Sequence, residues 1–382
     1  KITSKNTTVK SSGKTPIFYS PYFSAALGKE RQTGFLIPKL GTSSFKGFMI
    51  NQPFYWALDD NKDVTLEADY MSKLGIGKRV QYRYLDFDGR GIWNAYHLYD
   101  TKKQQHYEEI RGSSDLTITQ DIKAFADVNY INHRDFYQRL ASNPNETSQR
   151  FLQSTAQVSA LADDNNRFYL LGQYWMDLQR DQEHLEPQRL PELGYTLQPI
   201  KSGPFVIDMS SSIANFFRER NVRGQRFDIM PTISHSFGDE IRVRQSLSLR
   251  ESAYRLTNDS EGRSSINREE VIYQAYAQSR FLKQYDSFTH ILEPSVEYQF
   301  VSQTKSAPMF DSTELLTRAS EVTFSLMNRL AFQSSQLLLR LSQPYGINSL
   351  SQDKWVQPSR LDSVYLATWG SIASDISYSF PR

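Results

Sequence analysis

The chain has 382 residues, and its 44 basic and 42 acidic side chains leave a net charge of only +2. This balance does not predict a nucleic-acid partner. The absence of cysteine excludes disulfides, thiolate metal sites and a cysteine nucleophile. Aromatic residues make up 13% of the chain, yet no apolar run approaches the roughly 18 residues of a membrane-spanning helix. A membrane-spanning chain of this kind must be a closed barrel, because lipid cannot satisfy unpaired backbone groups.

The first residues, 1–14, are polar and lack the apolar stretch of a secretory signal. We therefore expect that a signal was removed or that the chain starts inside a longer protein. Two strands are expected next. Pro21 lies within the first of them, and Pro38 ends the second.

From residue 64 onward, apolar and polar residues alternate in segment after segment, which is the pattern of strands with one apolar face. The clearest segments are 64–70, 122–130, 205–210, 241–250 and 322–330. Clusters of turn-forming residues separate roughly sixteen expected strands. Some connections are short, whereas 179–191 and 303–315 are long and polar. This asymmetry is typical of outer-membrane barrels, which have tight periplasmic turns and longer external loops.

One strand indicates which face meets lipid. Ile241, Val243, Leu247 and Leu249 alternate with Arg242, Arg244 and Arg250. An arginine at the bilayer midplane of a barrel costs about 2–4 kcal/mol, so we expect the three arginines to face the lumen. There they could bind lipid phosphates, form internal ion pairs or contact a plug protein. A soluble β-sandwich would also alternate, but with fewer strands or with linkers between domains.

Several segments resemble segments of the LptD family of lipopolysaccharide transport proteins, and they follow one another in the same order along the chain. The matching segments are 16–23 (PIFYSPYF), 33–38 (TGFLIP), 52–56 (QPFYW), 63–65 (DVT), Tyr70, Arg83-Tyr84, 226–231 (RFDIMP) and 290–294 (HILEP) with Val296, Tyr298 and Phe300. The resemblance implies a periplasmic β-jellyroll followed by an outer-membrane barrel of about twenty-six strands. It predicts that residues 1–15 end the jellyroll and that residues 16–382 form the N-terminal part of the barrel. The predicted fold class is therefore an all-β, antiparallel transmembrane barrel, incomplete in this chain, with a jellyroll remnant.

The resemblance also implies a function. The barrel would insert lipopolysaccharide into the outer leaflet, with the jellyroll facing the periplasm. The implied partners are an LptE-like lipoprotein plug, an LptA-like periplasmic bridge, the Bam barrel-insertion machinery during folding, and outer-membrane lipids. No cofactor and no chemical catalysis are implied.

A lipid with a large polar head would leave such a barrel sideways, which requires two neighbouring strands to separate. Proline donates no backbone hydrogen bond and is normally excluded from strand interiors. Pro21 and Pro38 could therefore weaken pairing where the first and last strands of the barrel meet and so form a lateral gate, the role that the resemblance implies. The alternative is that both prolines only mark strand ends or bulges.

An aromatic cluster surrounds these prolines, and it has two interpretations. It could line a path for acyl chains, or it could be the ordinary aromatic girdle at the membrane interface. Its members include Phe18, Tyr22, Phe23, Phe35, Tyr55 and Trp56.

Two other functions stay open at this stage. A porin-like diffusion channel would conduct ions without a partner. An outer-membrane hydrolase would use a serine and a histidine, and His235 lies between Ser234 and Ser236. Alternating small polar residues are also normal on a luminal face, and the six histidines show no metal-ligand spacing.

Overall fold

The computed structural model describes residues 2–11, 15–25, 31–141, 143–179, 186–315, 319–347 and 369–380. Before residue 31, side chains are described only for residues 5, 6 and 8. The described residues fall into two compact units. The first unit comprises Lys1–Ala156 and Met176–Asp181, and the second comprises Gln157–Trp175 and Gln182–Arg382.

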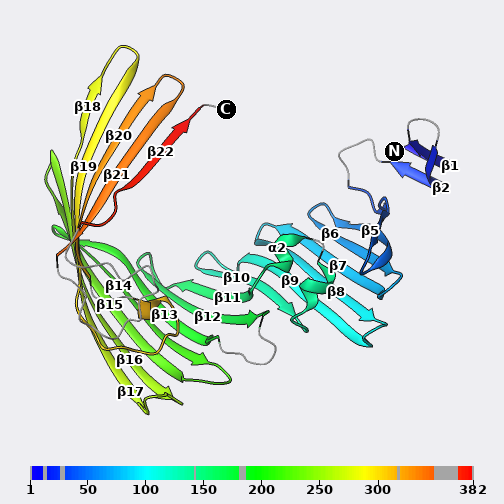
Figure 1. Cartoon of the computed structure of the whole chain (residues 1–382), viewed down its shortest axis with the longest axis horizontal. Helices are drawn as coiled ribbons and strands as arrows, with labels where there is room; N and C mark the ends of the chain where they lie inside the picture. The colour runs from blue at the N-terminus through cyan, green and yellow to red at the C-terminus, as the bar shows by residue number, and fades with distance from the viewer. Residues whose placement is uncertain are drawn as a thin grey trace. The chain divides into compact units, whose positions relative to one another are not determined.

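The first unit begins with a two-stranded antiparallel sheet and continues with the first strands of a much larger sheet (Figure 1). Its elements are β1 (Ile2–Ser11), β2 (Thr15–Ala25), β3 (Gly34–Phe35), β4 (Lys39–Ser43), β5 (Gly47–Asp59), β6 (Lys62–Met71), β7 (Gly75–Asp86), β8 (Gly89–Asp100), β9 (Gln105–Thr117), β10 (Ile122–Ile131), α1 (Phe136–Leu140) and α2 (Pro144–Thr147). The strands β11 (Phe151–Leu161) and β12 (Asn166–Asp177) contribute residues to both units.

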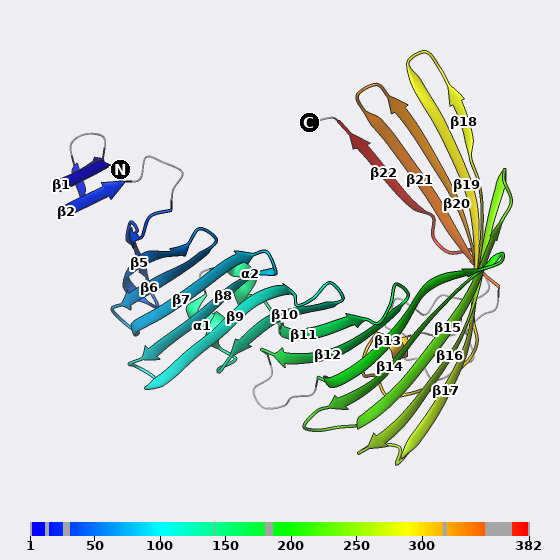
Figure 2. The same cartoon turned by 180° about the vertical axis from the view of Figure 1, so that it is seen from behind.

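The second unit holds the remaining strands, which follow one another as antiparallel neighbours (Figure 2). They are β13 (Gln188–Ser202), β14 (Phe205–Phe217), β15 (Arg223–Phe237), β16 (Ile241–Thr257), β17 (Ser265–Ser279), β18 (Phe281–Gln284), β19 (Phe288–Val301), β20 (Ala319–Phe332), β21 (Gln336–Gly346) and β22 (Ala373–Ser379), with the 3₁₀ helix η1 (Ser312–Leu315) between β19 and β20.

Within the described residues, β3 to β22 form one sheet of twenty strands in chain order, in which β3 and β4 both pair with β5, and β17 and β18 both pair with β19. This up-and-down order is typical of outer-membrane barrels, and the predicted all-β, antiparallel fold class is confirmed. The expected count of roughly sixteen strands is too low. Segments as short as β3 and β18 are strands because a neighbouring strand pairs with them. Two or four residues are too few to show an alternating pattern in the sequence.

Turns of two residues join the strands at one set of ends. Asp59 pairs with Lys62, Asp86 with Gly89, and Ser202 with Phe205. In the last turn Gly203 has φ +61°, a backbone conformation that glycine adopts without a steric penalty. The opposite ends carry the longer connections, including 132–150 and 302–315. The predicted asymmetry of short and long connections is confirmed.

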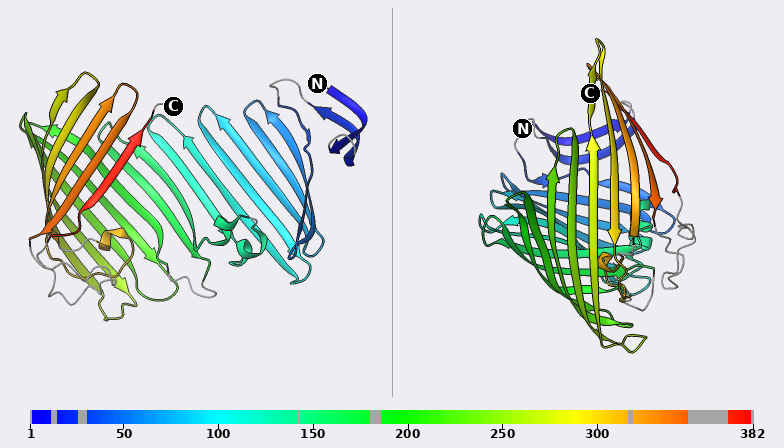
Figure 3. Two further views of the ribbon diagram at one scale, coloured as in Figure 1. Left: turned by 45° about the horizontal axis from the view of Figure 1, so that its top comes forward. Right: turned by 90° about the vertical axis from the view of Figure 1, so that its left-hand side faces the viewer.

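Each unit of the sheet has one polar and one apolar face, and Figure 3 shows the strands of each unit side by side. In the first unit Asp63 and Glu109 are 3% and 5% exposed on the polar face. The opposite, apolar face exposes large hydrocarbon side chains, among them Leu66, Ile76, Val80 and Ile110 in the first unit and Phe227, Ile241, Leu247 and Leu249 in the second. Buried charges on one face and exposed hydrocarbon on the other is the reverse of the pattern expected for a sheet surrounded by water.

None of the helices in the described part of the chain is long and apolar enough to cross a membrane.

Candidate functional site

A loop with two short helices covers the polar face in the first unit. We call residues 132–150, which contain α1 and α2, the helical loop. Arg139 lies 2.6 Å from the carboxylate of Asp100, and the Tyr137 hydroxyl donates a 2.8 Å hydrogen bond to Glu109. Both carboxylates are almost fully buried. Ion pairs and hydrogen bonds therefore hold the helical loop against β8 and β9.

The same loop also holds the turn between β4 and β5. The Lys46 ammonium donates a 2.6 Å hydrogen bond to the carbonyl of Leu140, at the C-terminal end of α1. A cation is favourable there because the last carbonyls of a helix lack partners. The Arg139 guanidinium lies over the Phe45 ring at 4.9 Å. The turn of the first hairpin of the large sheet is thus held to the helical loop.

Pairing at the start of that hairpin is interrupted. Phe35 pairs with Phe54 and Lys39 pairs with Asn51, so four residues advance on one strand while three advance on the other. The extra residue makes a β-bulge, and Pro38 lies within it. We call this region, formed by β3, β4 and the facing part of β5, the first seam.

A second proline weakens the first seam from the other strand. The carbonyl of Pro53 accepts a 2.9 Å hydrogen bond from the Leu36 N–H, but Pro53 has no N–H to donate in return. The side chain of Gln52 takes over this bond, because its amide Nε2 donates to the carbonyls of Leu36 at 2.9 Å and of Pro53 at 3.0 Å. A side-chain hydrogen bond thus stands where an antiparallel ladder has a backbone bond.

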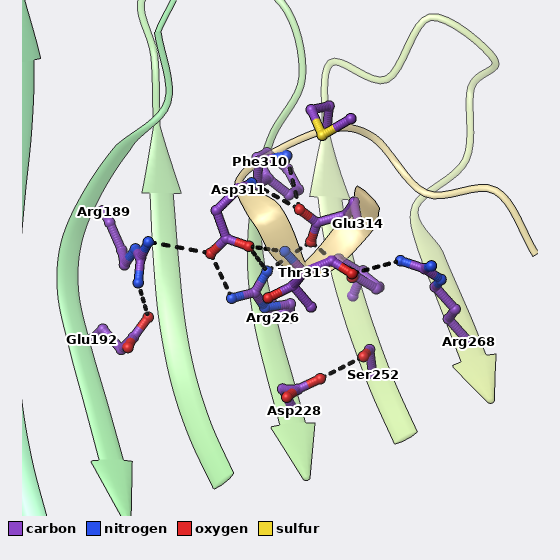
Figure 4. Close-up of polar contacts among 12 residues, drawn as sticks. Arg189, Glu192, Arg226, Asp228, Ser252, Arg268, Phe310, Asp311, Thr313 and Glu314 are labelled. Atoms are coloured by element: carbon purple, nitrogen blue, oxygen red, sulfur yellow. Dashed lines mark hydrogen bonds and ion pairs between the residues drawn. The ribbon is translucent and has the colours of Figure 1, made fainter. Parts of the chain in front are cut away.

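In the second unit, another loop covers the polar face. We call residues 302–315 the cap loop; they include η1 and lie over β13–β17 (Figure 4). Arg226, 3% exposed, donates to both carboxylate oxygens of Asp311 at 2.9 and 2.8 Å and to Glu314 at 2.7 Å. Phe310 stacks on Phe216 with ring centroids 4.6 Å apart. One buried guanidinium and one ring therefore anchor the cap loop.

Neighbouring charges extend this anchor. Arg189 reaches Asp311 at 3.4 Å, and Arg268 donates to the carbonyl of Thr313 at 3.3 Å. Arg250 forms a two-pronged pair with Asp228 at 2.8 and 3.0 Å. These contacts satisfy charges that would otherwise be costly to bury.

The pKa of Asp311 lies below its ordinary value. Burial alone would raise the pKa, but the hydrogen bonds and charge of Arg226 outweigh it, and the Thr313 N–H adds a further bond. A depressed pKa in the docked state means that the contribution of Asp311 is complete above its undocked value of about 4 and is lost as pH falls further. We expect the cap loop to stay docked between pH 7 and 5 and to open only well below pH 4.

Hydrogen exchange of the Phe310 and Asp311 amides, which donate to Glu314, measures this docking. Asp311→Asn removes the titrating carboxyl group, so the exchange rates of these amides should depend less on pH in the acid range. Opening between pH 7 and 5 would contradict the assignment.

The structure separates the residues that the sequence proposed for the gate. The backbone of Pro21 lies in β2, which pairs with β1 in its own two-stranded sheet. Its side chain, like those of Phe18, Tyr22 and Phe23, lies outside the described residues. Pro38 does lie in the large sheet, between β3 and β4. The roles of both prolines, and the division of the chain at residue 15, stay predictions.

The remaining aromatic residues lie on different faces. Phe35 is 77% exposed and meets Phe54 edge-to-face at 5.1 Å, and Trp56 follows Phe54 on the same face. The Tyr55 hydroxyl instead donates to Asp63 on the polar face at 3.4 Å. The described members of the cluster therefore do not form one continuous lining.

The three arginines of β16 lie on the polar face. Arg250 belongs to the ion-pair network, whereas Arg242 and Arg244 are exposed. His235 lies between the rings of Phe205 and Phe237 on the apolar face. Its neighbours Ser234 and Ser236 lie on the opposite face, because strand side chains alternate. The geometry therefore does not join them into a catalytic pair.

Sequence reasoning missed two features, namely Gln52 with Pro53 and Arg226 with Asp311. Pro53 in the segment 52–56 was an available signal, because proline is normally excluded from strand interiors. Nothing local connects Arg226 with a loop residue 85 positions away.

Comparisons with known proteins agree on one family. The family model described as LPS transport system D matches residues 104–325, and a second, LptD protein, matches residues 14–119. The LPS-assembly protein LptD of Methylococcus capsulatus is 28% identical over 315 residues, which cover 78% of this chain and 30% of that protein. The LptD proteins of Pseudoalteromonas atlantica and Pseudomonas aeruginosa are 28% and 25% identical, and the matches cover 78% of this chain and 41% and 38% of those proteins. The chain spans less than half the length of these relatives. Among solved structures, OpdQ of Pseudomonas aeruginosa is 10% identical with a TM-score of 0.32 over 78% of this chain and 84% of that one.

Proposed function

We propose that this chain, which belongs to the LPS transport system D (LptD) family, forms part of an outer-membrane barrel that inserts lipopolysaccharide into the outer leaflet. The polar face would line the route of the sugar head. The apolar face, with its exposed leucine, isoleucine and phenylalanine side chains, would contact the acyl chains of the membrane.

The observation that carries the proposal is the interrupted ladder of the first seam. Sideways release of an amphiphile requires strands to separate, and each unpaired backbone group in lipid costs several kcal/mol. At the first seam Pro38 and Pro53 remove donors in advance, and Gln52 supplies a bond that its side chain can release. The strand formed by β3 and β4 would be the movable leaf of a lateral gate.

The contacts of Lys46 and Arg139 give this leaf a direction of movement. They tie the turn between β4 and β5 to the helical loop, whereas β3 pairs with β5 through only two described residue pairs. The leaf would therefore separate from its Gly34 end and stay anchored at its Ser43 end.

The family also suggests partners for the whole protein. We propose an LptE-like lipoprotein in contact with the polar face, an LptA-like bridge that delivers lipopolysaccharide from the periplasm, and folding by the Bam machinery. The periplasmic orientation of residues 1–15 belongs to the same proposal. No step of the proposed transport requires catalysis by this chain.

Replacing both seam prolines by alanine tests the proposal. Alanine restores an N–H at positions 38 and 53, and each backbone bond regained stabilises the closed leaf by about 1 kcal/mol. We expect Pro38→Ala with Pro53→Ala to slow the appearance of new lipopolysaccharide at the cell surface by roughly thirtyfold.

The matched control is Pro231→Ala, which changes a proline of the β14–β15 ladder and should leave export unchanged. Both variants are made in the full-length protein, and its level in the membrane is measured. Undiminished export by the double variant would refute the gate assignment.

A further inference from the structure

A cavity of about 520 Å³ lies between the helical loop and the polar face of β4 to β9. Its volume is in the range of pockets that hold small molecules. Lys39 and Gly41 of β4 form one wall, and Phe136 and Tyr137 of α1 form another. The cavity therefore borders the strand that we propose as the leaf of the gate.

The walls combine aromatic rings with planar polar groups. Tyr96, Phe136 and Tyr137 are each no more than 5% exposed, and Asn51, Asn94 and Glu109 line the same space. Sugar rings suit such walls, because their C–H faces pack on aromatic rings and their hydroxyls both donate and accept hydrogen bonds.

Among the described residues, two buried polar atoms of the cavity lining have no hydrogen-bond partner in the protein. They are Oδ1 of Asn51, an acceptor, and Nε of Arg111, a donor. A buried polar atom without a partner costs about 1–3 kcal/mol, so such atoms call for an explanation. A ligand rich in hydroxyls offers partners of both kinds.

The charge on one face of β4 and the exposed hydrocarbon on its other face indicate that the ligand is an amphiphile. Lys39 is exposed at the cavity wall, where its ammonium can meet a phosphate. On the opposite face of the same strand Leu40 is 64% exposed, and the preceding Ile37 is 78% exposed. A molecule whose head occupies the cavity can thus extend hydrocarbon along the other side of β4.

We propose that this cavity binds the phosphorylated sugar head of the transported glycolipid just before the molecule passes the first seam. The inference rests on the proposed function and deepens it, because it assigns a binding site beside the gate. Lys39 contacts the phosphate, and Asn51 and Arg111 contact sugar hydroxyls.

Thiol protection tests the site directly. These 382 residues contain no cysteine, and the full-length protein without the substitution gives the background labelling. Gly41→Cys places a thiol on the cavity wall, and Thr42→Cys places one on the apolar face of the same strand. The probe is lipopolysaccharide stripped of its acyl chains with its phosphates retained. In the full-length protein with its partners, we expect the probe to slow maleimide labelling of the Gly41→Cys variant at least fivefold and to leave the Thr42→Cys variant unaffected.

Binding of the same probe, measured by calorimetry, gives a second readout. Gly41→Leu fills the cavity, since the new Cβ meets only the flexible Met49 terminus at 3.1 Å, and should weaken binding at least tenfold. Lys39→Gln should weaken binding of the phosphorylated probe about threefold to tenfold and leave a dephosphorylated probe unchanged. Lys78→Gln, on the apolar face of β7, is the matched control.

The outcomes separate this inference from the proposed function. Equal protection of both thiols, or full affinity of the Gly41→Leu variant, would overturn the cavity as the site. Protection by inorganic phosphate alone would overturn the recognition of sugar. Either result leaves the proposed function standing if the proline variants still slow export, whereas normal export by those variants rejects the gate even where the probe binds.

Discussion

A disulfide across the first seam is expected to stop lipopolysaccharide export. Gly34 and Tyr55 face each other in the register of β3 and β5, and a Cβ at Gly34 meets nothing within 4 Å. Directly opposite residues have Cβ atoms about 4.5–5.5 Å apart, so a small adjustment permits a disulfide between cysteines at both positions. Because a covalent bond cannot open with the leaf, we expect export by the oxidised Gly34→Cys, Tyr55→Cys protein to fall by more than tenfold.

The measurement is the rate at which pulse-labelled lipopolysaccharide becomes accessible to a membrane-impermeant reagent. Reduction of the disulfide should restore export, and this recovery also controls for the loss of the Tyr55–Asp63 contact. A disulfide between Leu66→Cys and Val80→Cys joins two strands of an uninterrupted ladder and should have little effect. If the oxidised seam exports at the reduced rate, the leaf does not move at β3.

Replacing Arg226 by methionine is expected to release the cap loop. The substitution keeps much of the side-chain volume but leaves the carboxylates of Asp311 and Glu314 without their main cation. Removing one partner of a buried ion pair costs about 3–5 kcal/mol, which corresponds to a shift of roughly 10²–10⁴-fold in the docking equilibrium. Tryptic cleavage at Lys305 and exchange of the Phe310 amide should both accelerate.

Two further variants distinguish the loss of the buried ion pair from a general loss of stability. Arg242→Met removes an exposed arginine from the same face and should change docking by less than about 0.5 kcal/mol. Combining Arg226→Met with Asp311→Asn and Glu314→Gln removes the uncompensated charges and should recover much of the docking. Unchanged cleavage in the Arg226→Met protein would show that Phe310 and its aromatic neighbours suffice to hold the loop.

The sequence alone indicates most of the longer strands and their two faces. Alternation is a local property with a period of two. The faces on which Ile241, Arg242 and Val243 lie can therefore be assigned without knowing which strands pair with theirs. The long connection 303–315 is also visible in the sequence, because polar residues cluster there between the apolar runs, whereas the helical loop is not expected from the sequence and β13 begins at Gln188, inside the expected connection 179–191. The arginines of β16 were placed on the polar face for an energetic reason that holds for any membrane barrel.

Only the tertiary structure decided which side chains meet. Arg250 pairs with Asp228 on a neighbouring strand, and Arg226 finds Asp311 in a loop that folds back over the sheet. Such contacts depend on register and on loop conformation, which no local period encodes. The Gln52 side chain likewise replaces the missing N–H of Pro53 only once β3 and β5 pair. It is this pairing that brings the Leu36 carbonyl to a position where a backbone donor would otherwise bind it.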